Sequence, residues 1–95
     1  MGQKQDKDGW WGFLILCSKI KSPEEFKMFF DLFLTIEEKE TIGKRFLIVK
    51  ALQEGKLTQR EIVNDFGVSI SQITRGSNAL KIIDPALKKI LEKLL

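Results

Sequence analysis

The stretch that decides the fold is Leu57-Thr58-Gln59-Arg60-Glu61-Ile62-Val63-Asn64-Asp65-Phe66-Gly67-Val68-Ser69-Ile70-Ser71-Gln72-Ile73-Thr74-Arg75. Thr58 followed three residues later by Glu61 is a capping-box pattern, which predicts the start of a helix. Gly67 can adopt the left-handed conformation that a sharp turn after this helix requires. Ser69 and Gln72 repeat the capping pattern and predict a second helix. Two short helices about a glycine predict a helix-turn-helix over about residues 58–79, whose second helix enters the major groove of DNA.

The apolar residues of this stretch predict how the two helices pack. Ile62 and Phe66 are four residues apart and share one face of the first helix. We expect Ile70 and Ile73 of the second helix to turn back toward that face. The outer surface is then polar and carries Gln59, Arg60, Ser71, Gln72 and Thr74. An ordinary helical hairpin with a polar face would have the same spacing, so the motif alone leaves both interpretations open.

The remaining chain is predicted to be helical throughout, which gives an all-α fold of six helices. Apolar residues recur at spacings of three and four over residues 10–20, 23–34, 36–54 and from 85 onward, and no segment alternates as a strand does. The third of these helices has a predicted inner stripe of Ile42, Phe46, Val49 and Leu52, and Gly55 should end it. Residues 1–8 are predicted to form a mobile arm and residues 9–95 a single domain.

The helix predicted from Pro23 to Leu34 is apolar on every side. Its apolar residues go all the way round the helix: Phe26, Met28, Phe29, Phe30, Leu32, Phe33 and Leu34. Such a helix must be buried on every side, and a 95-residue monomer has little room for that. We therefore predict that this helix lies between the two subunits of a homodimer. A central helix inside a monomer is the alternative.

Charge and composition narrow the class of function. Residues 44–81 carry 7 Lys and Arg against 3 Asp and Glu, net +4, whereas residues 1–43 carry 6 against 8, net −2. Positive charge on the helix-turn-helix segment suits a surface that binds DNA phosphates. The chain has no histidine and one cysteine, Cys17, so it offers no zinc site and no Ser-His or Cys-His catalysis. We predict a cytoplasmic protein that is not an enzyme and has no metal or membrane partner.

An unusual glycine lies near the end of the second helix of the helix-turn-helix, the recognition helix. Gly76 lies inside a predicted helix, where glycine costs about 1 kcal/mol relative to alanine. It would let another group approach the backbone closely. Arg75 precedes it, and Lys44 and Arg45 lie on the third helix. Two arginines without nearby acids could stack their planar guanidinium groups on an aromatic ligand. Contacts of both arginines with DNA phosphates are an equally good interpretation from the chemistry alone.

Four segments together resemble the bacterial tryptophan repressor family. They are Leu32-Phe33-Leu34-Thr35, Gly43-Lys44-Arg45, Leu57-Thr58-Gln59-Arg60-Glu61 and, most specifically, Gln72-Ile73-Thr74-Arg75-Gly76-Ser77-Asn78-Ala79-Leu80-Lys81. The close resemblance covers residues 32–81. It implies an intertwined all-α homodimer that binds palindromic operator DNA of genes for tryptophan biosynthesis or salvage when L-tryptophan, the corepressor, is bound. A helix-turn-helix protein that needs no ligand is the alternative.

The resemblance also implies which residues form each site. In the ligand site, Arg45 and Arg75 would hold the indole ring, Arg75 would also meet the carboxylate, and Gly76 would let the ligand lie against the helix. Leu32, Leu34 and Thr35 of the partner subunit would receive the amino group. Ala79 replaces a serine that contacts the ligand in well-known members, so its hydroxyl is missing here. The predicted DNA-binding residues are Lys56, Gln59, Arg60 and Lys81 on phosphates, and Ile70, Ser71, Gln72 and Thr74 facing the bases.

Overall fold

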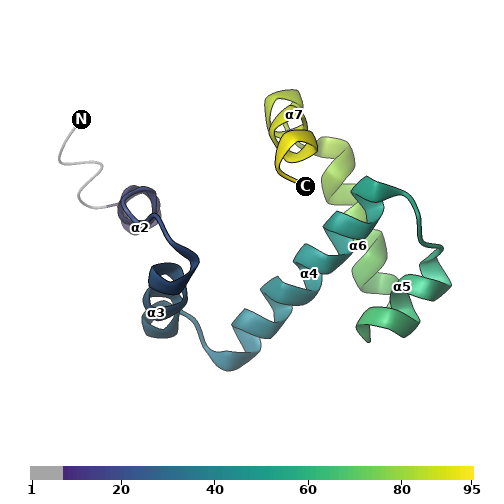
Figure 1. Cartoon of the computed structure of the whole chain (residues 1–95), viewed down its shortest axis with the longest axis horizontal. Helices are drawn as coiled ribbons and strands as arrows, with labels where there is room; N and C mark the ends of the chain where they lie inside the picture. Colours follow the sequence, from purple (N-terminus) through teal and green to yellow (C-terminus); the bar gives the residue numbers. More distant parts are fainter. Residues whose placement is uncertain (1–7) are drawn as a thin grey trace. The chain divides into compact units, whose positions relative to one another are not determined.

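The computed structural model of the chain describes residues 8–95, and over that range it contains helices and no strand. The chain divides after Thr35 into two compact units, each of which is described by itself (Figure 1). The first unit contains α2 (Gly9–Ser18) and α3 (Pro23–Phe33). The second contains α4 (Ile36–Glu54), α5 (Gln59–Phe66), α6 (Ile70–Ile82) and α7 (Pro85–Leu94). The prediction of an all-α fold with six helices is confirmed; the single domain predicted for residues 9–95 stays a prediction.

Side chains at the helix ends explain the bounds of the first unit. The Asp8 side chain accepts a hydrogen bond from the Trp11 backbone N–H at 3.1 Å and begins α2. This helix ends at Ser18, before the predicted Ile20, and the Ser18 hydroxyl donates to the Ile15 carbonyl at 2.6 Å. Apolar spacing continued to residue 20 and could not reveal this stop. Apart from Asp8, the arm predicted for residues 1–8 lies outside the described residues.

Phenylalanine rings hold α2 and α3 together. The Phe13 ring of α2 lies 5.5 Å from the Phe29 ring and 5.4 Å from the Phe33 ring, measured between centroids, and the Phe33 contact is edge-on. Phe29 and Phe33 are themselves 4.8 Å apart on α3. Offset and edge-on aromatic pairs at such distances add to the stability that burial gives. Among residues 8–35, however, none is buried, so the apolar side chains of this range remain half-buried or exposed.

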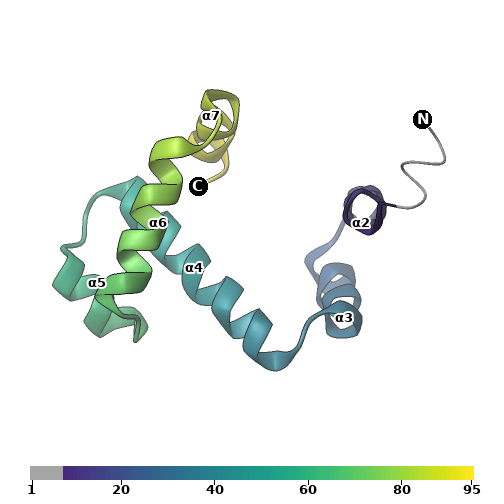
Figure 2. The same ribbon diagram turned by 180° about the vertical axis from the view of Figure 1, so that it is seen from behind.

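The core of the second unit lies where α4, α5 and α6 meet (Figures 1 and 2). Leu52, Leu57, Val63 and Phe66 pack around it as partly buried residues. The buried residues at its centre are Ile48, Ala51, Ile62, Val68 and Ile73.

The predicted inner stripe of α4 is wrong at its N-terminal end. Ile42 and Phe46 are 55% and 51% exposed, whereas Ile48 and Ala51 are buried. The reason is that α6 contacts the face of α4 that carries Ile48 and Leu52. The helix has apolar residues on more than one face, and spacing alone did not indicate which face the rest of the unit covers. At its C-terminal end α4 stops as predicted, at Gly55 with a φ of 67°.

Candidate nucleic-acid interface and ligand pocket

Both helices of the helix-turn-helix begin with the capping boxes that the sequence predicts. In α5 the Thr58 N–H donates to Glu61 Oε1 at 2.8 Å, and the Glu61 N–H donates to Thr58 Oγ1 at 3.2 Å. In α6 the Ser69 N–H donates to Gln72 Oε1 at 2.8 Å, and the Gln72 N–H donates to Ser69 Oγ at 3.1 Å. Gly67 between them is left-handed, with a φ of 63°. Four backbone N–H donors that would otherwise be unpaired thus receive local acceptors, which sets the start of each helix.

Helix α6 divides into a covered face and an open face. Ile73 is fully buried and Gly76 is buried against α4. The sequence placed Ile70 in the core with Ile73, and this prediction is wrong because Ile70 is 52% exposed. Residue 70 is the first of the helix, three positions before Ile73, and lies at the edge of the α5–α6 contact. Its apolar side chain is therefore free to meet another molecule.

Most of the predicted DNA-binding residues lie exposed on the second unit. Gln59, Arg60 and Ile70 come together at a surface groove that Thr58, Val63 and Asn64 complete. The other exposed members are Lys56, Ser71, Thr74 and Lys81. Gln72 is the exception: it is half-buried and lies on the α4 side of α6.

Arg45, one of the two predicted ligand-binding arginines, lines a small hollow between α4 and α6. Thr41, Ile48 and Gln72 line the same hollow. Its volume is about 20 Å³, which is room for about one water molecule and too little for an indole ring. Arg45 and Arg75 form no ion pair within residues 8–95, so their guanidinium groups keep their donors for other partners.

Gly76 has a packing role that the sequence did not reveal. A Cβ at this position would lie 2.9 Å from Ile48 Cγ2 and 3.7 Å from Leu52 Cδ1. The glycine therefore lets α6 approach α4 closely beside the Arg45 hollow. Its predicted contact with a ligand stays a prediction.

The remaining predicted ligand residues lie in two places. Arg75 and Ala79 are exposed on α6, at positions three and seven residues after Gln72. Leu32, Leu34 and Thr35 belong to the first unit, where Leu32 is 79% exposed and Leu34 is half-buried.

A protein-family model described as "Trp repressor protein" matches residues 8–95. The chain belongs to the Trp repressor family. Its curated relatives include the "Trp operon repressor homolog" of Chlamydia caviae, which is 60% identical over 94 residues, covering 99% of this chain and 93% of that protein. The protein of the same name in Chlamydia trachomatis serovar D is 50% identical over 91 residues, covering 96% and 97%. That of Vibrio cholerae is 36% identical over 95 residues, covering 100% and 92%.

Membership of the Trp repressor family makes this chain a DNA-binding transcriptional repressor rather than an enzyme. The sequence predicted both the family and the class of function. Within residues 8–95 no cluster of three or more potential metal ligands occurs. No helix in that part of the chain is long and apolar enough to cross a membrane.

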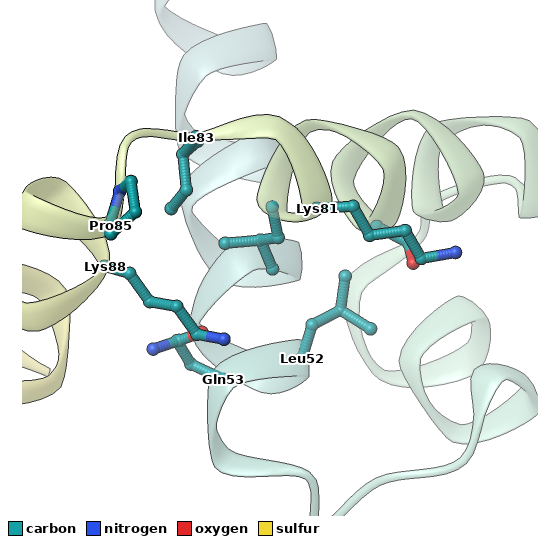
Figure 3. A pocket seen from close by; sticks show the side chains of 8 residues that line it. Leu52, Gln53, Lys81, Ile83, Pro85 and Lys88 are labelled. Atoms are coloured by element: carbon teal, nitrogen blue, oxygen red, sulfur yellow. The ribbon is translucent and has the colours of Figure 1, made fainter.

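The repressor also has a larger hollow that the sequence did not predict (Figure 3). Leu52 and Gln53 of α4, Lys81 of α6, and Pro85 and Lys88 of α7 line it. Ser77, Leu80 and Ile83 complete the lining. Among the predicted DNA-binding residues only Lys81 lies here. A lysine can rest its aliphatic chain on such an apolar surface while its ammonium group stays in solvent. This arrangement is compatible with the predicted contact to phosphate.

Proposed function

We propose that this repressor is a homodimer that binds palindromic operator DNA of tryptophan biosynthesis or salvage genes, with L-tryptophan as corepressor. It acts in the cytoplasm. The observation that carries the proposal is the division of α6 into two faces. One face packs on α4 beside the Arg45 hollow, and the other leaves Ile70, Ser71 and Thr74 open. A ligand on the first face can therefore move the surface that would meet the bases.

The exposed apolar side chains support the homodimer. In the first unit Leu32 is 79% exposed, and Trp10 and Met28 are similarly open. In the second unit Ile82 is 85% exposed, and Leu94 is also largely in solvent. Large apolar side chains exposed in such number are typical of surfaces that another protein covers. A second copy of the chain, intertwined as the family resemblance implies, would cover both sets.

The small size of the Arg45 hollow supports a ligand site shared between subunits. One chain provides Arg45, Arg75, Gly76 and Ala79, and its hollow is too small for indole. Leu32, Leu34 and Thr35 of the second chain would complete the site, as the resemblance implies. Arg45 and Arg75 would stack on the two faces of the indole ring, since guanidinium groups stack well on aromatic rings.

The switch that we propose is a population shift. A dimeric helix-turn-helix protein binds half-sites about one helical turn, roughly 34–36 Å, apart. L-tryptophan beside α6 would favour the positions of the two α6 helices that match this spacing. A ligand shifts such an equilibrium only by its difference in affinity between the two states.

The test is the affinity for DNA with and without L-tryptophan. Operator sequences are first selected from a random palindromic library in the presence of about 1 mM L-tryptophan. This concentration is at the upper end of the range that is usual for small metabolites bound by proteins. Fluorescence anisotropy then measures the dissociation constant of the best sequence in both conditions. We expect roughly 5- to 150-fold tighter binding with L-tryptophan, the usual range of allosteric coupling. Equal affinity in both conditions would establish the alternative, a repressor that binds DNA without a ligand.

A further inference from the structure

Gln72 lies on the pocket face of α6 rather than on its open face. It is followed at three, four and seven residues by Arg75, Gly76 and Ala79, and residues at these spacings share one face of a helix. At Gly76 this face packs on α4, as the close approach to Ile48 demonstrates, whereas Arg75 and Ala79 on the same face are exposed. Gln72 is accordingly half-buried and lines the hollow with Arg45, whereas the neighbouring Ser71 is exposed. Its surroundings are those of a pocket residue.

The oxygen and the nitrogen of the Gln72 side-chain amide differ in their hydrogen bonds. Oε1 accepts the Ser69 N–H at 2.8 Å and so fixes the first turn of α6. A carboxamide also has an Nε2 group with two N–H donors. Within residues 8–95 Nε2 has no hydrogen-bond acceptor. The side chain is thus held in place by its oxygen, beside Arg45, with its donors unused.

We propose that Gln72 is a residue of the corepressor site and that its Nε2 donates a hydrogen bond to the carboxylate of the bound ligand. This inference rests on the proposed function, in which the Arg45 hollow takes an indole amino acid. Arg45 in the lining of the hollow already favours an anion at this place, and Arg75 follows Gln72 by three residues on α6. Gln72 adds a neutral donor whose position is fixed, because its own oxygen is held by the Ser69 cap. The same side chain therefore joins the ligand to the turn that begins the recognition helix.

The decisive variant is Gln72→Glu. Glutamate is as suitable as glutamine at the last position of a capping box, so the Ser69 N–H keeps its acceptor. The substitution replaces the two N–H donors by a carboxylate oxygen that repels an anionic ligand. Gln53→Glu is the matched control, since it makes the same chemical change on α4. Gln53 lines the larger hollow beside α7 and not the Arg45 hollow (Figure 3). Thermal unfolding of all three proteins checks that the fold is kept.

The measurement is calorimetric titration of the full chain with L-tryptophan and with two analogues. Indole-3-acetate has a carboxylate and no amine, and tryptamine has an amine and no carboxylate. For Gln72→Glu we expect roughly a 10- to 100-fold loss of affinity for L-tryptophan and indole-3-acetate, the usual effect of removing a hydrogen bond to a charged group. Affinity for tryptamine should be kept or increased. Gln53→Glu should bind all three ligands within about twofold of the original protein, because the new charge lies in the hollow beside α7 and not in the lining of the Arg45 hollow.

The outcomes separate this inference from the proposed function. If the original protein binds L-tryptophan and Gln72→Glu binds it equally well, the role of Gln72 is wrong and the proposed function stands. A parallel loss for tryptamine would also overturn the inference, since it would indicate a general disturbance of the pocket. The same holds if Gln53→Glu loses as much affinity. If the original protein binds no L-tryptophan, the proposed function fails and the role of Gln72 fails with it.

Discussion

Replacing Gly76 by alanine is the most direct perturbation of the contact between α4 and α6. The new Cβ would lie 2.9 Å from Ile48 Cγ2, although carbon atoms prefer a separation of about 3.5–4.0 Å. Ile48 is 2% exposed, and its Cγ2 is bonded directly to a branched Cβ whose rotation is restricted. The side chain cannot simply turn away. The two helices must therefore move apart, or the core around Ile48 must repack.

The size of the effect follows from two opposing terms. Inserting a methyl group into a packed contact costs about 1–3 kcal/mol. Alanine in place of glycine inside a helix raises the free energy of unfolding by about 1 kcal/mol. We therefore expect Gly76→Ala to lower the free energy of unfolding by about 0–2 kcal/mol. Gly43→Ala, inside α4 with no atom within 4 Å of the added Cβ, should instead raise it by about 1 kcal/mol.

The assay is urea unfolding followed by circular dichroism at one fixed protein concentration, because a dimer has a concentration-dependent stability. Gly76→Ala should unfold at lower urea than Gly43→Ala, with the two free energies differing by about 1–3 kcal/mol. If Gly76→Ala were as stable as Gly43→Ala, the packing of α6 on Ile48 would be wrong, and with it the position of the Arg45 hollow.

Three further predictions concern the DNA-binding surface, the ligand and the turn. Arg75→Ala should abolish the effect of L-tryptophan on DNA affinity, and analytical ultracentrifugation should show that the proposed dimer is kept. An unchanged affinity for L-tryptophan would refute the place of Arg75 in the pocket. Lys81→Ala should weaken binding to all DNA sequences alike and lower the magnitude of the slope of log affinity against log salt concentration by about one. A loss of affinity confined to the operator would exclude a phosphate contact of Lys81. Gly67→Ala should lower the free energy of unfolding by about 1–2 kcal/mol, because the φ of 63° is unfavourable for any residue with a Cβ; no change in urea midpoint would mean that the turn adopts another conformation.

Local signals made the helix-turn-helix predictable from sequence. Thr58 with Glu61 and Ser69 with Gln72 are patterns whose hydrogen bonds form within four residues, so no knowledge of distant parts of the chain is needed. Gly67 likewise has a local reason, its left-handed conformation. The family resemblance was specific for the same reason: its most characteristic residues follow one another directly in α6.

Contacts between distant segments were less predictable. Ile42 and Phe46 have correct helical spacing, but spacing cannot tell whether a partner helix covers them. Gly76 was predicted to lie against a ligand, which stays a prediction, and its close approach to Ile48 could not be predicted because it depends on how α6 lies across α4. Gln72 was grouped with Ser71 and Thr74 as a polar residue of the recognition helix. Only its position beside Arg45 reveals that it lies on the other face.

The central claim is that L-tryptophan and operator DNA favour the same state of the repressor, and reciprocity tests it most directly. Calorimetry would measure the affinity for L-tryptophan of the free protein and of the protein saturated with operator. We expect one L-tryptophan to bind per chain, and to bind more tightly in the presence of operator by the same factor by which L-tryptophan tightens DNA binding. Equal affinity for L-tryptophan with and without operator would contradict it, because the ligand would then not control the recognition helix.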